Sequence, residues 1–250
     1  MAKSLPHRPD MDWLRKAAKE RLDELRASDP NARLFQAQLA LAQDYGFPSW
    51  RALKAHVDSI SLDGQIIRAA QEGKADELAA LLDEHPAKLN VTGGSWERPL
   101  LHLAAEAGHD NVVKVLLDRG FDANKRDKWD NATALHWAAE DGRIKVAKLL
   151  LDAGADVQGD GDAHLVGTLG WAVVLGHVRR IGHLRIGTPD DDVAALLLQR
   201  GAKHSIFTAL ALNDAEIVRA LVVADPALLR ARMSRFEGYQ TPLHLAVRKD

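Results

Sequence analysis

The chain has 250 residues, a formal net charge of −2 and no cysteine. The near balance of charge argues against a protein that coats nucleic acid, and the lack of cysteine excludes disulfides, cysteine zinc sites and thiol catalysis. No stretch is long and apolar enough to span a membrane, and residues 1–9 lack the apolar segment of a secretory signal, so we expect a soluble cytoplasmic protein.

Residues 1–60 predict an N-terminal region of three short helices. Apolar residues recur at helical spacing over residues 13–25, which predicts the first helix. Asp29 and Pro30 predict the N-cap and the first position of the second helix. Pro48 is expected to open the third. These short amphipathic helices could form a small bundle or a cap on the segment that follows.

Two later segments repeat one pattern at an interval of 34 residues. Residues 101–120 contain LHLAAEAGH, VVKVLL and a glycine, and residues 135–154 contain LHWAAEDG, VAKLLL and a glycine. An interval of this length predicts a stack of similar units that bury a shared core. Less regular copies start near residues 66, 169, 206 and 241, which predicts about five units and a C-terminal half unit over residues 61–250.

The fourth copy is longer than the others because an insertion at residues 176–188 delays its second helix. The insertion carries two histidines whose spacing does not suit a shared metal on one helix face. It could bind an anion or a nucleic acid, line a small-molecule or enzymatic site beside a groove, or form a solvated loop. The residues that would act there are His177, Arg179, Arg180 and His183.

The repeated pattern resembles the ankyrin repeat family. Its T-P-L-H-x-A motif is intact at residues 241–246 and nearly intact at residues 133–138. The resemblance implies an all-α solenoid of helix–turn–helix units joined by short β-hairpin fingers. It also implies a non-enzymatic scaffold whose partner is another protein, and we expect no cofactor. Residues 39–54 are similar to a helical segment that precedes ankyrin repeats in bacterial proteins.

Two units depart from the family pattern. Gly170 and Phe207 stand where we place the motif histidine. The finger after Gly201 is nearly absent, because residues 202–205 lead straight into the next predicted helix. We therefore expect the packing of these two units to differ from that of their neighbours.

The motif histidines are His102, His136 and His244. Neighbouring helices pack about 8–10 Å apart, whereas a zinc–nitrogen bond is about 2 Å long, so adjacent motif histidines do not suit a shared metal. The resemblance implies instead that each one hydrogen bonds to backbone and ties two units together. Trp137 and Trp171 occupy matched positions of consecutive units, where a stacked pair could hold a ligand but helical core spacing favours packing.

A polar loop follows the third unit and holds Asp156, Asp160, Asp162 and His164. Such oxygen-rich loops can bind calcium, but the twelve-residue pattern of an EF-hand is missing. We interpret this loop as an ordinary finger turn.

The sequence contains no recognisable catalytic pattern. It has no G-x-S-x-G elbow, phosphate-binding loop, dinucleotide fingerprint or H-E-x-x-H motif. No acidic pair stands out as an acid and a base with separated pKa values. We therefore predict a protein that is not an enzyme and holds no metal.

Candidate partner contacts lie in the fingers and beside the groove of the array. Trp96, Trp129 and Tyr239 occupy polar connectors, where a ring either anchors an interface or folds back onto its own hairpin. The residues before the turn glycines give the groove an acidic edge in the second and third units. The predicted partner-binding residues are Trp96, Arg98, Glu106, Arg126, Trp129, Glu140 and Asp141.

Overall fold

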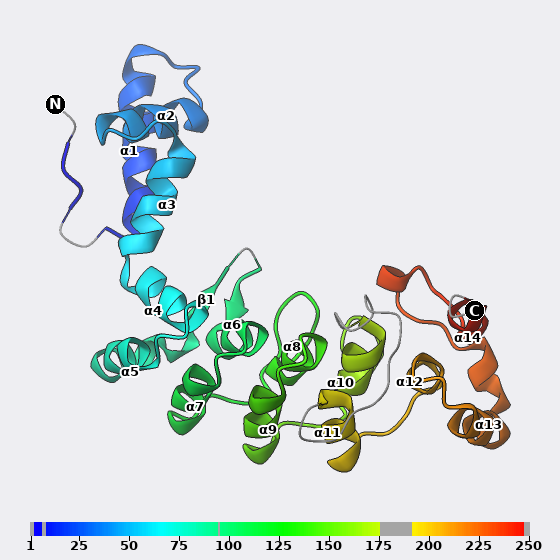
Figure 1. The fold of residues 1–250 in the computed structure, drawn as a ribbon. Helices are drawn as coiled ribbons and strands as arrows, with labels where there is room; N and C mark the ends of the chain where they lie inside the picture. Colours follow the sequence, from blue (N-terminus) through cyan, green and yellow to red (C-terminus); the bar gives the residue numbers. More distant parts are fainter. Residues whose placement is uncertain (1–2, 7–8, 95, 176–191, 248–250) are drawn as a thin grey trace. The chain divides into compact units, whose positions relative to one another are not determined.

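Figure 1 shows the fold in a computed structural model, which describes residues 3–6, 9–94, 96–175 and 192–247. Contacts divide the chain into two compact units, Met1–Arg68 and Ala69–Asp250, which we call the N-terminal unit and the array. Within the described residues, no helix is both long and apolar enough to cross a membrane.

The N-terminal unit is built from short helices that share one core. The Asp10 side chain accepts a hydrogen bond from the Trp13 amide at 2.7 Å, and the Ser49 hydroxyl accepts one from the Ala52 amide at 3.2 Å, so each caps a helix. The buried core residues are Leu14, Ala18, Leu41, Ala42, Leu53 and Val57. The helices are α1 (Met11–Ser28), α2 (Leu34–Asp44) and α3 (Trp50–Ile60).

The prediction that Asp29 and Pro30 begin the second helix is wrong. α2 begins at Leu34, and the Asp29 carboxylate accepts a local amide hydrogen bond that closes a turn between α1 and α2. The Gln36 side chain accepts a hydrogen bond from the Arg33 amide at 2.7 Å. The N-terminus of α2 is therefore capped from inside the helix, as in a capping box.

α4 (Leu62–Gln71) spans the boundary between the two units, and the array continues as a series of helix pairs (Figure 1). The first helices contact one another in succession from the second pair onward, and the second helices do so as far as the fourth pair, which confirms the predicted all-α solenoid. After α5 (Ala75–Glu84), the pairs are α6 (Leu100–Ala107) with α7 (Asp110–Asp118), α8 (Ala134–Glu140) with α9 (Ile144–Asp152), α10 (Gly167–Gly170) with α11 (Val193–Gln199), and α12 (Ile206–Ala211) with α13 (Ala215–Ala224), followed by α14 (Pro242–Val247).

The second helices show why the repeated pattern produces a stack. In α7 the buried residues are Val112, Val113 and Leu116, and the matching face of α9 buries Val146, Ala147 and Leu150. This spacing places the apolar residues on one side of each helix, toward its neighbours. In the fourth pair, a π-helical turn, η2 (Trp171–Leu175), extends α10.

Hairpin fingers connect the pairs. In the first finger, residues 92–99, strands β1 (Thr92–Gly93) and β2 (Arg98–Pro99) are antiparallel. The second finger, residues 122–133, is closed by an antiparallel bridge between Arg126 and Thr133. The third finger covers residues 156–166, whereas residues 202–205 form only a short connector between α11 and α12. The predicted insertion at residues 176–188 lies outside the described residues.

Two buried histidines tie neighbouring pairs together. His102 Nε2 donates a hydrogen bond to the Ala132 carbonyl and His136 Nε2 donates one to the Gly159 carbonyl, both at 3.0 Å. This confirms the structural role that the family resemblance implied. Gly159 has φ +63°, and a Cβ there would lie 2.5 Å from the His136 ring, so the close approach requires glycine.

The interpretation that Phe207 replaces the motif histidine is wrong by one residue. Ser205 caps α12 as Thr133 caps α8, so Thr208 occupies the position of His136. The Ser205 amide donates to Thr208 Oγ1 at 2.8 Å, and the Thr133 amide donates to His136 Nδ1 at 3.0 Å. A short hydroxyl thus replaces an imidazole in the cap, and Phe207 packs in the core.

His102 lacks the cap that His136 has. Its Nδ1 atom is buried and has no hydrogen-bond partner among the described residues. The position that Thr133 occupies before His136 is taken by Pro99, which has neither an amide hydrogen nor a hydroxyl. A buried acceptor without a partner costs about 1–3 kcal/mol.

Replacing Pro99 by threonine should therefore stabilise the array. Pro99→Thr supplies an amide hydrogen and a hydroxyl to His102 Nδ1, and it loses the smaller entropic benefit of proline. We expect the free energy of unfolding, measured by urea denaturation, to rise by about 1 kcal/mol. Pro86→Thr is the control, because Pro86 starts a 3₁₀ turn and precedes no buried imidazole. A variant no more stable than the parent would contradict the assignment.

Both buried imidazoles should also make stability depend on pH. Burial lowers the pKa of His102 from its usual 6.5 to about 4, and burial lowers the pKa of His136 to about 4 as well. The folded state therefore keeps both rings neutral, while the unfolded chain takes up protons below about pH 6.5. Stability is full above that pH and falls as the pH drops toward 4.

This dependence is measurable by urea denaturation at pH 7, 6 and 5, where the free energy of unfolding should decrease stepwise. His102→Gln is the matched variant, because its amide can still donate to the Ala132 carbonyl but does not titrate. Its pH dependence should be shallower than that of the parent. Equal slopes for the two proteins would show that His102 does not carry the effect.

Candidate functional site

The tips of the first two fingers bring two tryptophans together. Trp96 is 53% exposed and Trp129 is 55% exposed. Their ring centroids are 5.7 Å apart and the ring planes meet at 75°, so one ring edge faces the other ring. Each ring thus contacts the neighbouring finger while keeping about half of its surface open to solvent.

Asp127 holds the second finger in place. Its carboxylate is buried and accepts hydrogen bonds from the amides of Trp129 and Asp130 and from the Trp137 indole nitrogen, at 3.2, 2.8 and 3.0 Å. The Asp127 side chain therefore connects the turn that carries Trp129 to α8, the first helix of its pair.

Arg98 lies against the same inner helix. Its guanidinium carbon is 3.7 Å from the centroid of the Trp137 ring, and Nη1 donates to Glu106 Oε2 at 2.6 Å. The Arg98 side chain is only 13% exposed. Stacking and ion pairing therefore hold Arg98, in the second strand of the first finger, against Trp137 of α8 and Glu106 of α6.

Arg126 connects the second finger to the third. It donates to the Asn131 carbonyl at 2.5 Å and to the Asp160 carbonyl at 2.7 Å. Glu140 and Asp141, at the end of α8, are partly exposed beside the turn into α9. The charged residues predicted as partner contacts thus divide into two that brace the fingers, Arg98 and Arg126, and three on the inner helices.

The acidic loop of the third finger uses its carboxylates as hydrogen-bond acceptors. Asp162 is buried and accepts from the amides of His164 and Gly167 and from the Trp171 indole nitrogen, at 2.9, 2.8 and 3.1 Å. Asp156 accepts from the Gln158 amide at 3.0 Å. These contacts agree with a finger turn, and within the described residues no three His, Asp or Glu side chains are grouped to hold a metal ion.

Trp137 and Trp171 are core residues. Both are buried, and their ring centroids lie 5.1 Å apart at 74°. The Trp171 ring also contacts the rings of His136 and His164. Trp171 is 1% exposed and therefore offers no open face to a ligand. His177, Arg179, Arg180 and His183, which one alternative placed at a small-molecule site, lie outside the described residues.

Sequence reasoning missed a contact between distant fingers. His164 Nδ1 lies 2.5 Å from Glu237 Oε1, and Asp130 Oδ1 lies 3.9 Å from His164 Nε2. Burial, and after it the charge of Asp127, raise the pKa of Asp130 above its usual value. The contact joins the third finger to the loop before α14, across the short connector of residues 202–205.

The family comparison agrees with this architecture. Residues 66–159 match the family model described as ankyrin repeats (3 copies). No curated protein matches the chain. The matched segment includes α6 to α9 and the first two fingers, with Trp96 and Trp129 at their tips.

Removing the Asp127 carboxylate should loosen the second finger. Asp127→Ala leaves three N–H donors without their charged acceptor, so we expect the free energy of unfolding to fall by about 3 kcal/mol and the amides of Trp129 and Asp130 to exchange faster. Asp122→Ala, in the same finger, removes one exposed hydrogen bond and should cost about 1 kcal/mol or less. Urea denaturation and hydrogen exchange measure both effects. Equal losses in the two variants would contradict the bracing role of Asp127.

Proposed function

Residues 66–159 belong to the ankyrin repeat family, and from this premise we propose that the chain is a non-enzymatic scaffold that binds another protein through its first two fingers. Ankyrin repeats are generally modules of protein–protein interaction. In this proposal Trp96 and Trp129 contact the partner directly, and Glu106, Glu140 and Asp141 form an acidic edge beside them.

The observation that carries the proposal is the tryptophan pair. Two large rings from different fingers stand half exposed and already in contact, at a ring separation of 5.7 Å. Tryptophan is one of the residue types enriched among those that contribute most of the binding energy of protein interfaces. Because the rings are held before a partner arrives, little conformational freedom is lost when it binds.

Arg98 and Arg126 support the proposal as positioning residues. Arg98 is fixed between the Trp137 ring and the Glu106 carboxylate, and Arg126 spans two fingers. Both side chains are used within the array, so we assign them to holding the fingers in register rather than to contacting the partner. These contacts of Arg98 and Arg126 favour a rigid binding surface over a flexible one.

The cellular setting belongs to the same proposal. We place the protein in the cytoplasm, since a chain without cysteine is compatible with a reducing compartment. The similarity of residues 39–54 to a segment of bacterial ankyrin proteins favours a bacterial source. Affinity purification from that host, followed by mass spectrometry, is the direct way to identify the partner.

The double variant W96A/W129A should lose the partner and keep the fold. Both rings are half exposed, so truncation removes interface area without emptying the core. With the purified partner, isothermal titration calorimetry should show a Kd raised by about 30-fold or more, which corresponds to at least about 2 kcal/mol.

The matched control is Phe35→Ala, which removes another exposed aromatic ring, in the N-terminal unit. It should leave the Kd within about twofold of the parent, because Phe35 is not among the residues proposed to contact the partner. Thermal unfolding should give the same Tm for all three proteins. An unchanged Kd for W96A/W129A would reject the finger tips as the binding face.

A further inference from the structure

The arginines of the array differ between its two ends. Among the described residues of the array, each arginine as far as Arg200 donates a hydrogen bond or forms an ion pair, as Arg119 does with Asp83 and Arg200 with Asp152. The arginines after Arg200 make neither contact within that part of the chain. They are Arg219, Arg230, Arg232 and Arg235.

Three of these four arginines lie in one ordered loop, residues 230–240, which we call the basic loop. The Met233 amide donates to the Gln240 carbonyl at 2.9 Å and the Tyr239 amide donates to the Ser234 carbonyl at 3.0 Å, so the loop is closed by its own backbone. Two residues of the loop, Met233 and Ser234, are buried. The basic loop therefore has an inner side packed on the array and an outer side open to solvent.

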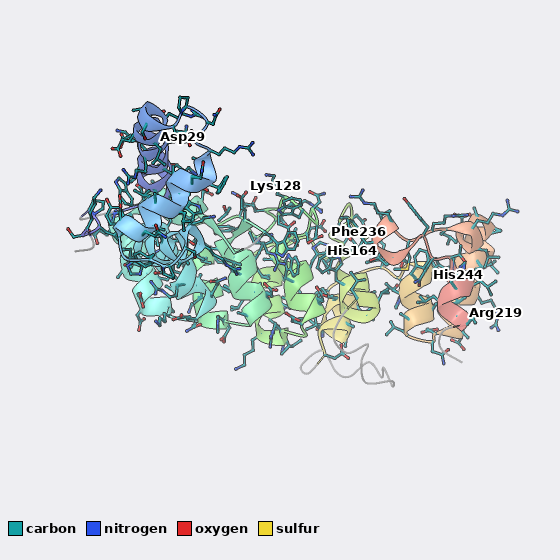
Figure 2. All side chains as sticks on the ribbon, turned by 90° about the horizontal axis from the view of Figure 1, so that it is seen from above. Asp29, Lys128, His164, Arg219, Phe236 and His244 are labelled. Carbon is teal, nitrogen blue, oxygen red and sulfur yellow. The ribbon has the colours of Figure 1, made fainter. Side chains whose placement is uncertain are left out.

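The acidic group of the basic loop points inward. Glu237 accepts a hydrogen bond from Ser234 Oγ at 2.6 Å, and its other oxygen lies 2.5 Å from His164 Nδ1. Only 9% of the Glu237 side chain is exposed. Figure 2 shows the neighbouring Phe236 beside His164, and their ring centroids are 5.2 Å apart. The outer side of the loop thus keeps its positive charge.

The outer side combines this charge with aromatic surface. Phe236 is 53% exposed and Tyr239 is 55% exposed, and both Arg232 and Arg235 are exposed. The Arg235 guanidinium carbon lies 4.9 Å from the centroid of the Phe236 ring, so the stacked ring holds one arginine in place. Arginine and aromatic residues are enriched at protein interfaces over the rest of the surface.

We propose that the basic loop is a second interaction surface, distinct from the tryptophan pair, and that it binds an acidic segment of a partner protein. Guanidinium groups form paired hydrogen bonds with carboxylates, and the exposed rings supply apolar contact beside them. A nucleic acid fits less well, because its continuous phosphate backbone would pass the third finger, where Asp156 and Asp160 are exposed.

Fluorescence anisotropy with the full chain tests this surface. The probe is a fluorescein-labelled peptide of glutamates with two phenylalanines, titrated at low and at high salt. R232E/R235E should weaken binding by about tenfold or more, and added salt should weaken binding of the parent. The control K114E/K145E changes the net charge equally but at exposed positions of α7 and α9, and it should stay within about twofold of the parent.

Other outcomes would overturn the proposal. No binding by the parent, or equal losses in both charge-reversal variants, would show that the basic loop does not recognise the acidic probe. Tighter binding of a labelled oligothymidine of equal charge, lost in R232E/R235E, would make the loop a nucleic-acid surface instead. If R232E/R235E has a lower Tm than the parent, R232Q/R235Q replaces it. W96A/W129A should bind the probe as the parent does, which separates this test from that of the proposed function.

Discussion

The array depends on each helix pair burying its apolar side against the next pair. Short helices such as α8, Ala134–Glu140, cannot enclose a core by themselves, so their stability comes from the neighbours on both sides. Polar hydrogen bonds set the register of these neighbours. An imidazole donates across the junction to a finger carbonyl, as His136 does to Gly159, and burial makes the loss of either partner costly.

Contacts with the buried core position the fingers. Asp127 and Asp162 do the same work in successive units, because each buried carboxylate accepts backbone amides of a finger turn and the indole N–H of a tryptophan, Trp137 or Trp171. In the second and third fingers, a single carboxylate side chain therefore connects the turn to a tryptophan of the following helical segment. This is why Trp129 can be exposed and still hold a defined position, against which the Trp96 ring packs.

Sequence reasoning reached the fold because equivalent packing in successive units requires similar residues at a constant interval. It placed the apolar faces of residues 101–154 because they recur, whereas the role of the histidines came from the resemblance to a known family. It failed where position depends on contacts that do not recur: Phe207 looked like the replaced histidine, and only the cap at Ser205 shows that Thr208 takes that place. The stacking of Arg98 on Trp137 likewise follows from how two units meet, which no local pattern encodes.

The least predictable contact follows from a missing element. Residues 202–205 are too few to form a finger, so the third finger and the basic loop meet across that position, and His164 pairs with Glu237 although 73 positions separate them. The pairing turns the acidic side chain of the loop inward and leaves Arg232 and Arg235 without a local counter-charge among the described residues. The short connector of residues 202–205 lets His164 reach Glu237. It therefore contributes to the positive charge on the outer side of the basic loop.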